Sequence, residues 1–93
     1  SREKSADAFA ELGTKTDALD TFNDRSISFE EKINSLKNII ENTEQINLGP
    51  YTFGKMNDTI YYMTGAKSGI PITEDNITKI IDAAEKAQEA INP

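Results

Sequence analysis

The sequence predicts an all-α fold, a small antiparallel bundle of three to four short helices built from residues 1–93 as a single helical domain. Two segments place apolar residues at helical spacing, and each segment follows a capping residue. Ser28 precedes Phe29, Ile33, Leu36 and Ile40, and Thr73 precedes Ile77, Ile80, Ile81, Ala84 and Ile91. Because a helix turns about 100° per residue, each set forms one apolar stripe that a neighbouring surface must cover.

The composition is that of one small, acidic, soluble domain. The 93 residues are 37% hydrophobic and 28% charged, with a net charge of −6, which is too apolar for a typical disordered chain. Isoleucine occurs twelve times and valine never, a bias that by association with codon usage favours a low-GC bacterium or phage as the source. The chain begins at Ser1 rather than at Met, so we expect a fragment or a processed form. The sequence leaves the localisation open.

The first helix is expected over residues 3–22. Residues of one helical face recur three or four positions apart, at Phe9, Leu12, Thr16 and Leu19. Gly13 lies inside this pattern and costs about 1 kcal/mol of helix propensity relative to alanine. This is therefore where the helix could bend or break.

The second helix is expected over residues 29–46. Ser28 and Glu31 have the spacing of a capping box, in which the serine oxygen accepts a hydrogen bond from the third helical amide and the glutamate bonds back to the serine amide. Asparagine and threonine residues weaken the last turns, and Gly49-Pro50 ends the helix.

Residues 50–65 fit two structures, of which we favour the helix. Pro50 suits a first helical turn, and four apolar residues follow at helical spacing: Phe53, Met56, Ile60 and Met63. The alternative is an α+β fold with a hairpin at 51–64, because residues 59–62 are strand formers and Asn57-Asp58 is a turn pair. Residues 59–63 do not alternate cleanly between apolar and polar side chains, which counts against the hairpin.

The final helix is expected to be capped by Thr73 and to continue to Ala90 or Ile91. The acidic residues Glu74 and Asp75 then lie in its first turn, where the helix dipole favours negative charge. Glycine and proline mark residues 66–71, which precede this helix, as a loop.

The residue types that catalysis most often needs are missing. The chain contains no Cys, His or Trp, so it has no thiolate nucleophile, no zinc–thiolate site and no imidazole base. Carboxylates, lysine and tyrosine could catalyse a reaction only in a strongly perturbing pocket. We therefore predict that the protein is not an enzyme and that it has no catalytic residues, no cofactor and no metal site.

One segment resembles the calcium-binding loop of the EF-hand family. It runs from Asp20 to Glu31 between two expected helices, and Asp24 stands at the fifth place of that loop. The resemblance implies a helix–loop–helix unit. Phe22 replaces one ligand and Arg25 stands where the loop requires glycine. A degenerate, EF-hand-like protein without metal is therefore one alternative for this chain.

Aromatic and thioether side chains gather between residues 51 and 63. We predict a partner-binding surface there and in the adjoining loop, formed by Tyr51, Lys55, Tyr61, Tyr62 and Lys67. Amphipathic tyrosine side chains are common anchors of protein interfaces. The alternative is that these aromatic residues pack at the rim of the core.

We expect the partner to be another protein. An acidic chain is poorly suited to nucleic acid, whose phosphates must be neutralised by Lys and Arg, and no segment is apolar enough over a sufficient length for a membrane span. The leading hypothesis is a non-enzymatic protein-binding module, such as an adaptor, inhibitor or assembly factor, that acts through a Tyr/Met-rich surface. The alternative is a structural component of a phage, plasmid-transfer or secretion assembly that works as a homo-oligomer.

Overall fold

The computed structural model describes the backbone of residues 2–91 and the side chains of residues 13–91. Its elements are, in chain order, α1 (Arg2–Asn23), α2 (Phe29–Ile39), β1 (Gln45–Leu48), β2 (Tyr51–Met56), β3 (Thr59–Gly65), β4 (Ser68–Pro71) and α3 (Ile77–Ile91). The fold is therefore α+β, and the prediction of an all-α helical bundle is wrong.

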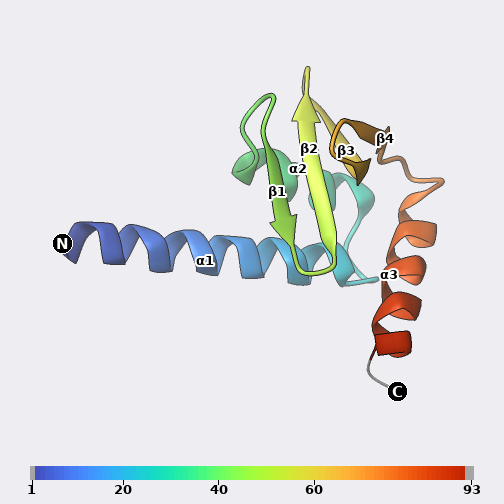
Figure 1. The fold of residues 1–93 in the computed structure, drawn as a ribbon, viewed down its shortest axis with the longest axis horizontal. Helices are drawn as coiled ribbons and strands as arrows, with labels where there is room; N and C mark the ends of the chain where they lie inside the picture. Colours follow the sequence, from blue (N-terminus) through green and yellow to red (C-terminus); the bar gives the residue numbers. More distant parts are fainter. Residues whose placement is uncertain (1, 92–93) are drawn as a thin grey trace.

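The strands form one antiparallel sheet in the order β1-β2-β3-β4, so each strand pairs with its neighbour in the chain. Figure 1 shows the sheet in front of α2, with α1 crossing behind the β1–β2 turn and α3 to one side. The helices thus pack against one face, which we call the covered face. The opposite face, which none of the described helices covers, is called the open face.

Residues 51–65 form a β-hairpin and not the favoured helix. Asn57 and Asp58 have positive φ angles of 50° and 67°, as the two central residues of a type I′ turn require. Phe53 lies opposite Tyr62 in the register of β2 and β3. The hairpin that was the alternative for this segment is the arrangement in the structure.

The helical spacing of four apolar residues misled the prediction for this segment, because they do not share a face. Phe53 and Ile60 are buried on the covered face. Met56 and Met63 lie on the open face, since successive residues of a strand point to opposite sides. The sequence does not alternate cleanly because the open face also carries large, partly apolar side chains.

The second helix is shorter than predicted, since α2 ends at Ile39 and not at residue 46. Its cap residue Ile40 is extended, with φ −107° and ψ 121°, and Thr43 has a left-handed φ of 67°. The chain then enters β1, where Leu48 is buried on the covered face. This short strand is stabilised by its pairing with β2, so the sequence of residues 45–48 alone does not predict it.

The prediction of the first helix is confirmed. α1 covers residues 2–23, although the side chains of Phe9 and Leu12 lie outside the described ones. The last helix also forms, but it begins later than predicted, at Ile77, so Glu74 and Asp75 lie in the turn before it and not in its first turn. Before α3, the backbone N–H of Thr73 donates to Asn76 Oδ1 at 2.8 Å, and the Asn76 N–H donates to Thr73 Oγ1 at 3.2 Å. This reciprocal cap is a capping box with asparagine in place of glutamate.

The hydrophobic core lies between the covered face and the helices. The ring of Phe22 from α1 is fully buried, and its centroid lies 4.8 Å from that of Tyr51 and 4.9 Å from that of Phe53. The aliphatic part of the core comes from α2, the sheet and α3, with Leu36, Ile40, Leu48, Ile60, Ile72, Ile77, Ile80 and Ile81. The apolar stripes that the sequence places behind Ser28 and Thr73 thus supply much of this core.

Candidate functional site

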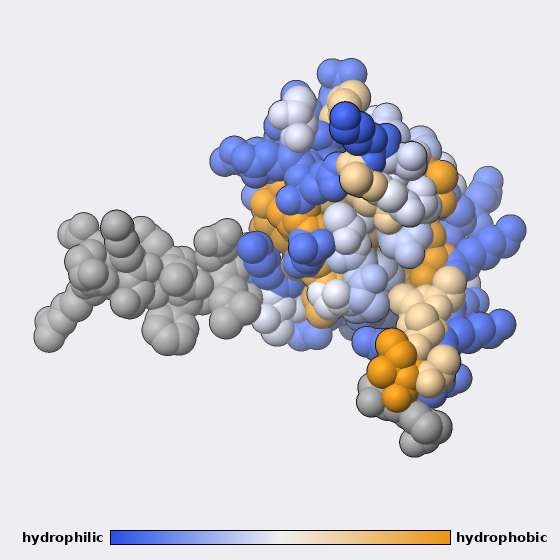
Figure 2. All heavy atoms as spheres, in the orientation of Figure 1, coloured by the Kyte–Doolittle hydropathy of each residue, from blue (hydrophilic) through white to orange (hydrophobic). Residues whose placement is uncertain are grey.

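The open face of the sheet carries a groove that reaches all four strands. The strand register places Gln45, Gly54, Tyr61 and Gly69 on this face. The groove has a volume of about 420 Å³. In Figure 2 the surface over the strands is mostly pale and blue, so the open face is partly polar and differs from an exposed piece of core.

Two glycines form the floor of the groove. A Cβ atom at Gly69 would lie 2.8 Å from the sulfur of Met63, and a Cβ at Gly54 would lie 3.2 Å from the same sulfur. Close-packed atoms do not tolerate such overlaps without moving. The two glycines therefore leave the space that the Met63 thioether occupies between β2 and β4.

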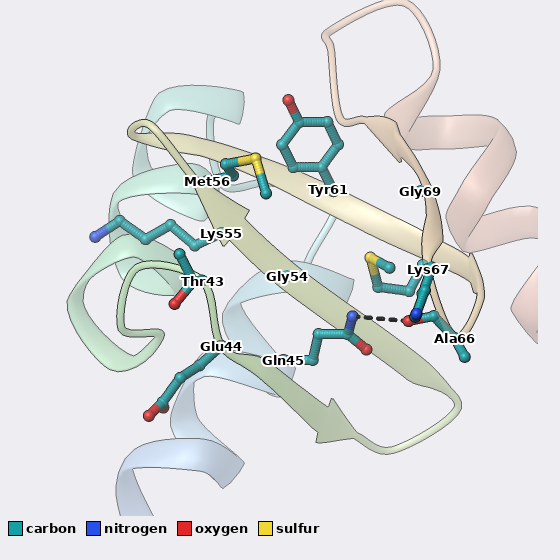
Figure 3. A pocket seen from close by; sticks show the side chains of 11 residues that line it. Thr43, Glu44, Gln45, Gly54, Lys55, Met56, Tyr61, Ala66, Lys67 and Gly69 are labelled. Carbon is teal, nitrogen blue, oxygen red and sulfur yellow. Dashed lines mark hydrogen bonds between the residues drawn. The ribbon is translucent and has the colours of Figure 1, made fainter.

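Tyr61 and Met56 form one side of the groove. Figure 3 shows these two side chains next to each other on neighbouring strands. The Met56 side chain is largely accessible, since the residue is 52% exposed, and Tyr61 is half-buried. Aromatic rings and flexible thioethers can both adapt to apolar groups of varied shape.

The side chain of Gln45 spans the groove from β1 to the β3–β4 turn. Its Nε2 donates a hydrogen bond to the carbonyl oxygen of Ala66 at 3.2 Å, the dashed line in Figure 3. A second hollow of about 310 Å³ shares Gln45, Met63 and Ala66 with the first one. The two hollows therefore adjoin each other at these three residues.

Three charged residues border the groove: Glu44, Lys55 and Lys67. In Figure 3 the side chains of Glu44 and Lys55 extend away from it, and the Lys55 ammonium donates to the carbonyl oxygen of Lys37 at 3.3 Å. Within residues 13–91, the Lys67 side chain takes part in no hydrogen bond or ion pair. Its ammonium group is thus available to a ligand.

The structure separates the five residues that the sequence places in one partner-binding surface. Tyr51 is 2% exposed and belongs to the core. Tyr62 lies on the covered face, with its ring edge-on to that of Tyr51 at 6.4 Å between centroids. Tyr61 and Lys67 line the groove, and Lys55 borders it.

Sequence reasoning missed Gln45 and the two floor glycines. In a helical interpretation of residues 50–65, Gly54 has no role, and Gln45 falls in the last turn of the second helix. The signal that could have found them is the Asn57-Asp58 turn pair, which fixes the hairpin and with it the alternation of faces.

Two buried ionisable groups lie away from the groove, and both have structural partners. The Tyr51 hydroxyl donates to Asn23 Oδ1 at 2.7 Å, and burial raises the pKa of Tyr51 to about 12. The Lys32 ammonium donates to the carbonyl oxygen of Phe22 at 2.8 Å, near the end of α1, where carbonyl groups lack helical partners. Burial lowers the pKa of Lys32. Both groups tie α1 to the rest of the fold.

The segment that resembles an EF-hand loop has a different geometry. α1 continues through Asp20 to Asn23, so the connection to α2 is much shorter than that loop. Asp24 Oδ1 accepts hydrogen bonds from the N–H and hydroxyl of Ser26 at 2.9 and 2.6 Å, which lower the pKa of Asp24. Among the described residues, no group of three or more Asp or Glu is placed to hold a metal ion.

Comparisons with models of protein families, with curated proteins and with solved structures found no match to this chain. None of the helices in the described residues combines the length and the hydropathy that crossing a bilayer requires.

Proposed function

We propose that the protein is a non-enzymatic binding module whose open-face groove holds a segment of another protein. The composition of the groove carries this proposal. The exposed face of an antiparallel sheet is ordinarily polar, yet here Met56, Tyr61 and Met63 surround a glycine floor. A concave surface with adaptable apolar side chains and a few polar groups is the usual form of a binding site.

Binding fits the groove residues better than catalysis does. The chain has neither Cys nor His, so a catalyst would depend on lysine, tyrosine or carboxylate groups. Such groups need a neighbour that activates them. Within the described residues, no hydrogen bond or ion pair joins the side chains of Glu44, Lys55, Tyr61 and Lys67 to one another.

A selection from a library of random peptides tests the proposal. Peptides that bind the wild-type protein should lose about five- to tenfold in affinity when Tyr61 or Met56 is replaced by alanine, because both side chains contact the peptide. Amide chemical shifts should change along β2, β3 and β4 on peptide addition.

Ile91→Ala is the matched control, since Ile91 is an apolar residue of α3 that is 76% exposed, whereas Met56 is 52% exposed. Peptide affinity should not change in this variant. The proposal would be refuted if the selected peptides changed the amide chemical shifts of α3 and not those of the sheet. It would also be refuted if the library yielded no binder. A homo-oligomer, seen by light scattering, that Met56→Ala dissociates would refute it as well, because a second copy of the chain would then occupy the groove.

A further inference from the structure

We infer that the groove selects an extended peptide segment in which a carboxylate lies close to an apolar side chain. The apolar side chain would lie against Met56, Tyr61 and Met63, and the carboxylate would pair with Lys67. This inference rests on the proposed function, because it specifies the chemistry of the segment that the groove binds.

Charge is unevenly distributed between the sheet and the rest of the chain. The charged residues within 45–71 are Lys55, Lys67 and Asp58, which give this segment a net charge of +1. Since the whole chain has a net charge of −6, the residues outside this segment sum to −7. The negative charge of this acidic protein therefore belongs to the helices and their connections. The strands alone would not repel an acidic ligand.

The helices pack on the covered face, on the side of the sheet opposite to the groove (Figure 1). Their exposed charges therefore act on a ligand at the open face mainly through the surrounding solvent, where salt screens them over about 8 Å. Among the described residues that line the groove, Glu44 has the one carboxylate, and its side chain extends away from the groove in Figure 3.

Lys67 is the charged group best placed to recognise a ligand. It lies in the β3–β4 turn beside Gly69, whereas Met56 and Tyr61 lie on another side of the groove (Figure 3). An ammonium group without a protein partner gains a charge-assisted hydrogen bond when a carboxylate arrives. Within residues 13–91, the groove offers a basic ligand no carboxylate that is directed into it (Figure 3), so the groove would discriminate by charge.

The division of the groove favours an extended segment. The two hollows, of about 420 and 310 Å³, share Gln45 in their lining, and alternate side chains of an extended chain would fill them in turn. The Gln45 amide can donate and accept. It can therefore exchange its bond with Ala66 for bonds to the backbone of the ligand, as in recognition of other extended peptides.

Fluorescence anisotropy with synthetic peptides tests the inference. Each peptide has a central leucine and one variable residue, which is Glu, Gln or Lys. The variable residue is placed in turn at each position beside the leucine. At the best position, the Glu peptide should bind about five- to tenfold more tightly than the Gln and Lys peptides. Lys67→Gln should abolish this preference, and Lys67→Glu should reverse it in favour of the Lys peptide.

Lys79→Gln provides the matched control, because Lys79 is an exposed lysine on α3 and its removal changes the net charge equally. The Glu preference should persist in this variant. Equal affinity of Glu and Gln peptides, with both weakened by Tyr61→Ala, would overturn the charge inference and leave the proposed function standing. A Glu preference that survives Lys67→Gln would also overturn it. Failure of every peptide to bind would instead count against the proposed function.

Discussion

The two faces of the sheet consist of the same strands but differ in what lies against them. Phe53 and Ile60 on the covered face are 0% and 2% exposed and pack against the helices. Their chain neighbours Gly54 and Tyr61 form the floor and a side of the groove. One step along a strand therefore separates a residue that stabilises the fold from one that can contact a ligand.

We expect stability and the proposed recognition of a ligand to vary independently, because they depend on opposite faces of the sheet. Packing energy depends on side chains that the helices cover, and these allow little change in volume. On the open face, the exposed side chains of Met56 and Lys67 can be replaced at low cost in stability, whereas a side chain at Gly54 or Gly69 would crowd the Met63 sulfur. The following predictions test how complete this separation is.

The largest difference is expected between Phe53→Ala and Tyr61→Ala. Phe53→Ala should lower the free energy of unfolding by about 3–5 kcal/mol, because it opens a cavity in the core. Tyr61→Ala should lower it by less than about 1 kcal/mol. Urea denaturation followed by circular dichroism measures both values. If Phe53→Ala does not fold, Ile60→Val takes its place, with an expected loss of about 0.5–1.5 kcal/mol. If the substitutions on the two faces lowered the free energy of unfolding equally, stability would not depend on the covered face alone.

A smaller effect is expected from the Tyr51 hydroxyl at high pH. The pKa of Tyr51 is raised to about 12 by burial, while that of an unfolded tyrosine is about 10. The resulting stabilisation is present below pH 10 and is lost as the pH rises to 12, since only the unfolded state ionises in this range. The loss amounts to about 2.7 kcal/mol, from about 1.36 kcal/mol per pKa unit.

Tyr51→Phe isolates this contribution from groups such as Lys32, whose lowered pKa acts in the opposite direction. The free energy of unfolding, measured by denaturation at several values between pH 8 and about pH 12, should fall more steeply with pH for the wild type than for Tyr51→Phe. At pH 7 the variant should lose only about 1 kcal/mol, the usual contribution of a hydrogen bond such as that to Asn23. If the free energy of unfolding had the same dependence on pH in the wild type and in Tyr51→Phe, Tyr51 would ionise normally in the folded protein.

The smallest effect is expected where the chain passes from α2 into the sheet. Thr43 has a φ of 67°, which is unfavourable for a β-branched residue and tolerated by asparagine. Thr43→Asn should raise the free energy of unfolding by about 1 kcal/mol. Asn57→Thr makes the reverse change in the β2–β3 turn, where φ is 50°, and should lower it by a similar amount. Thermal unfolding of both variants checks the pair, and shifts of the same sign would argue against backbone strain as the cause.

Local signals in the sequence were sufficient to detect the three helices, but not to place the end of α2 at Ile39 or the start of α3 at Ile77. Ser28 Oγ accepts from the Glu31 N–H at 3.2 Å, as the capping box predicts, and Thr73 and Asn76 bond to each other in the turn before α3. These contacts join residues three apart, so a single sequence contains both partners. For the candidate groove, the sequence indicated Tyr61 and Lys67, whose side chains the structure places there.

The sheet depended on contacts between residues distant in the chain, and so did the groove. Whether residues 51–65 form a helix or a hairpin was undecided locally, because Phe53, Met56, Ile60 and Met63 fit a helical stripe and Asn57-Asp58 fits a turn. Pairing between strands and burial of Phe53 against Phe22 decide for the hairpin. Strand stability comes from such cross-strand and interlayer contacts, which no short window of sequence contains.

The sequence by itself determined an acidic chain without Cys or His, two capped amphipathic helices, and an apolar stripe on each that had to be covered. Only the tertiary structure decided what covers those stripes, which side of each strand faces water, and that Gly54, Gly69 and Gln45 belong to one groove. The physical reason is the range of the interactions. Helix caps and stripes arise between near neighbours, whereas a sheet face exists only after separate segments have paired.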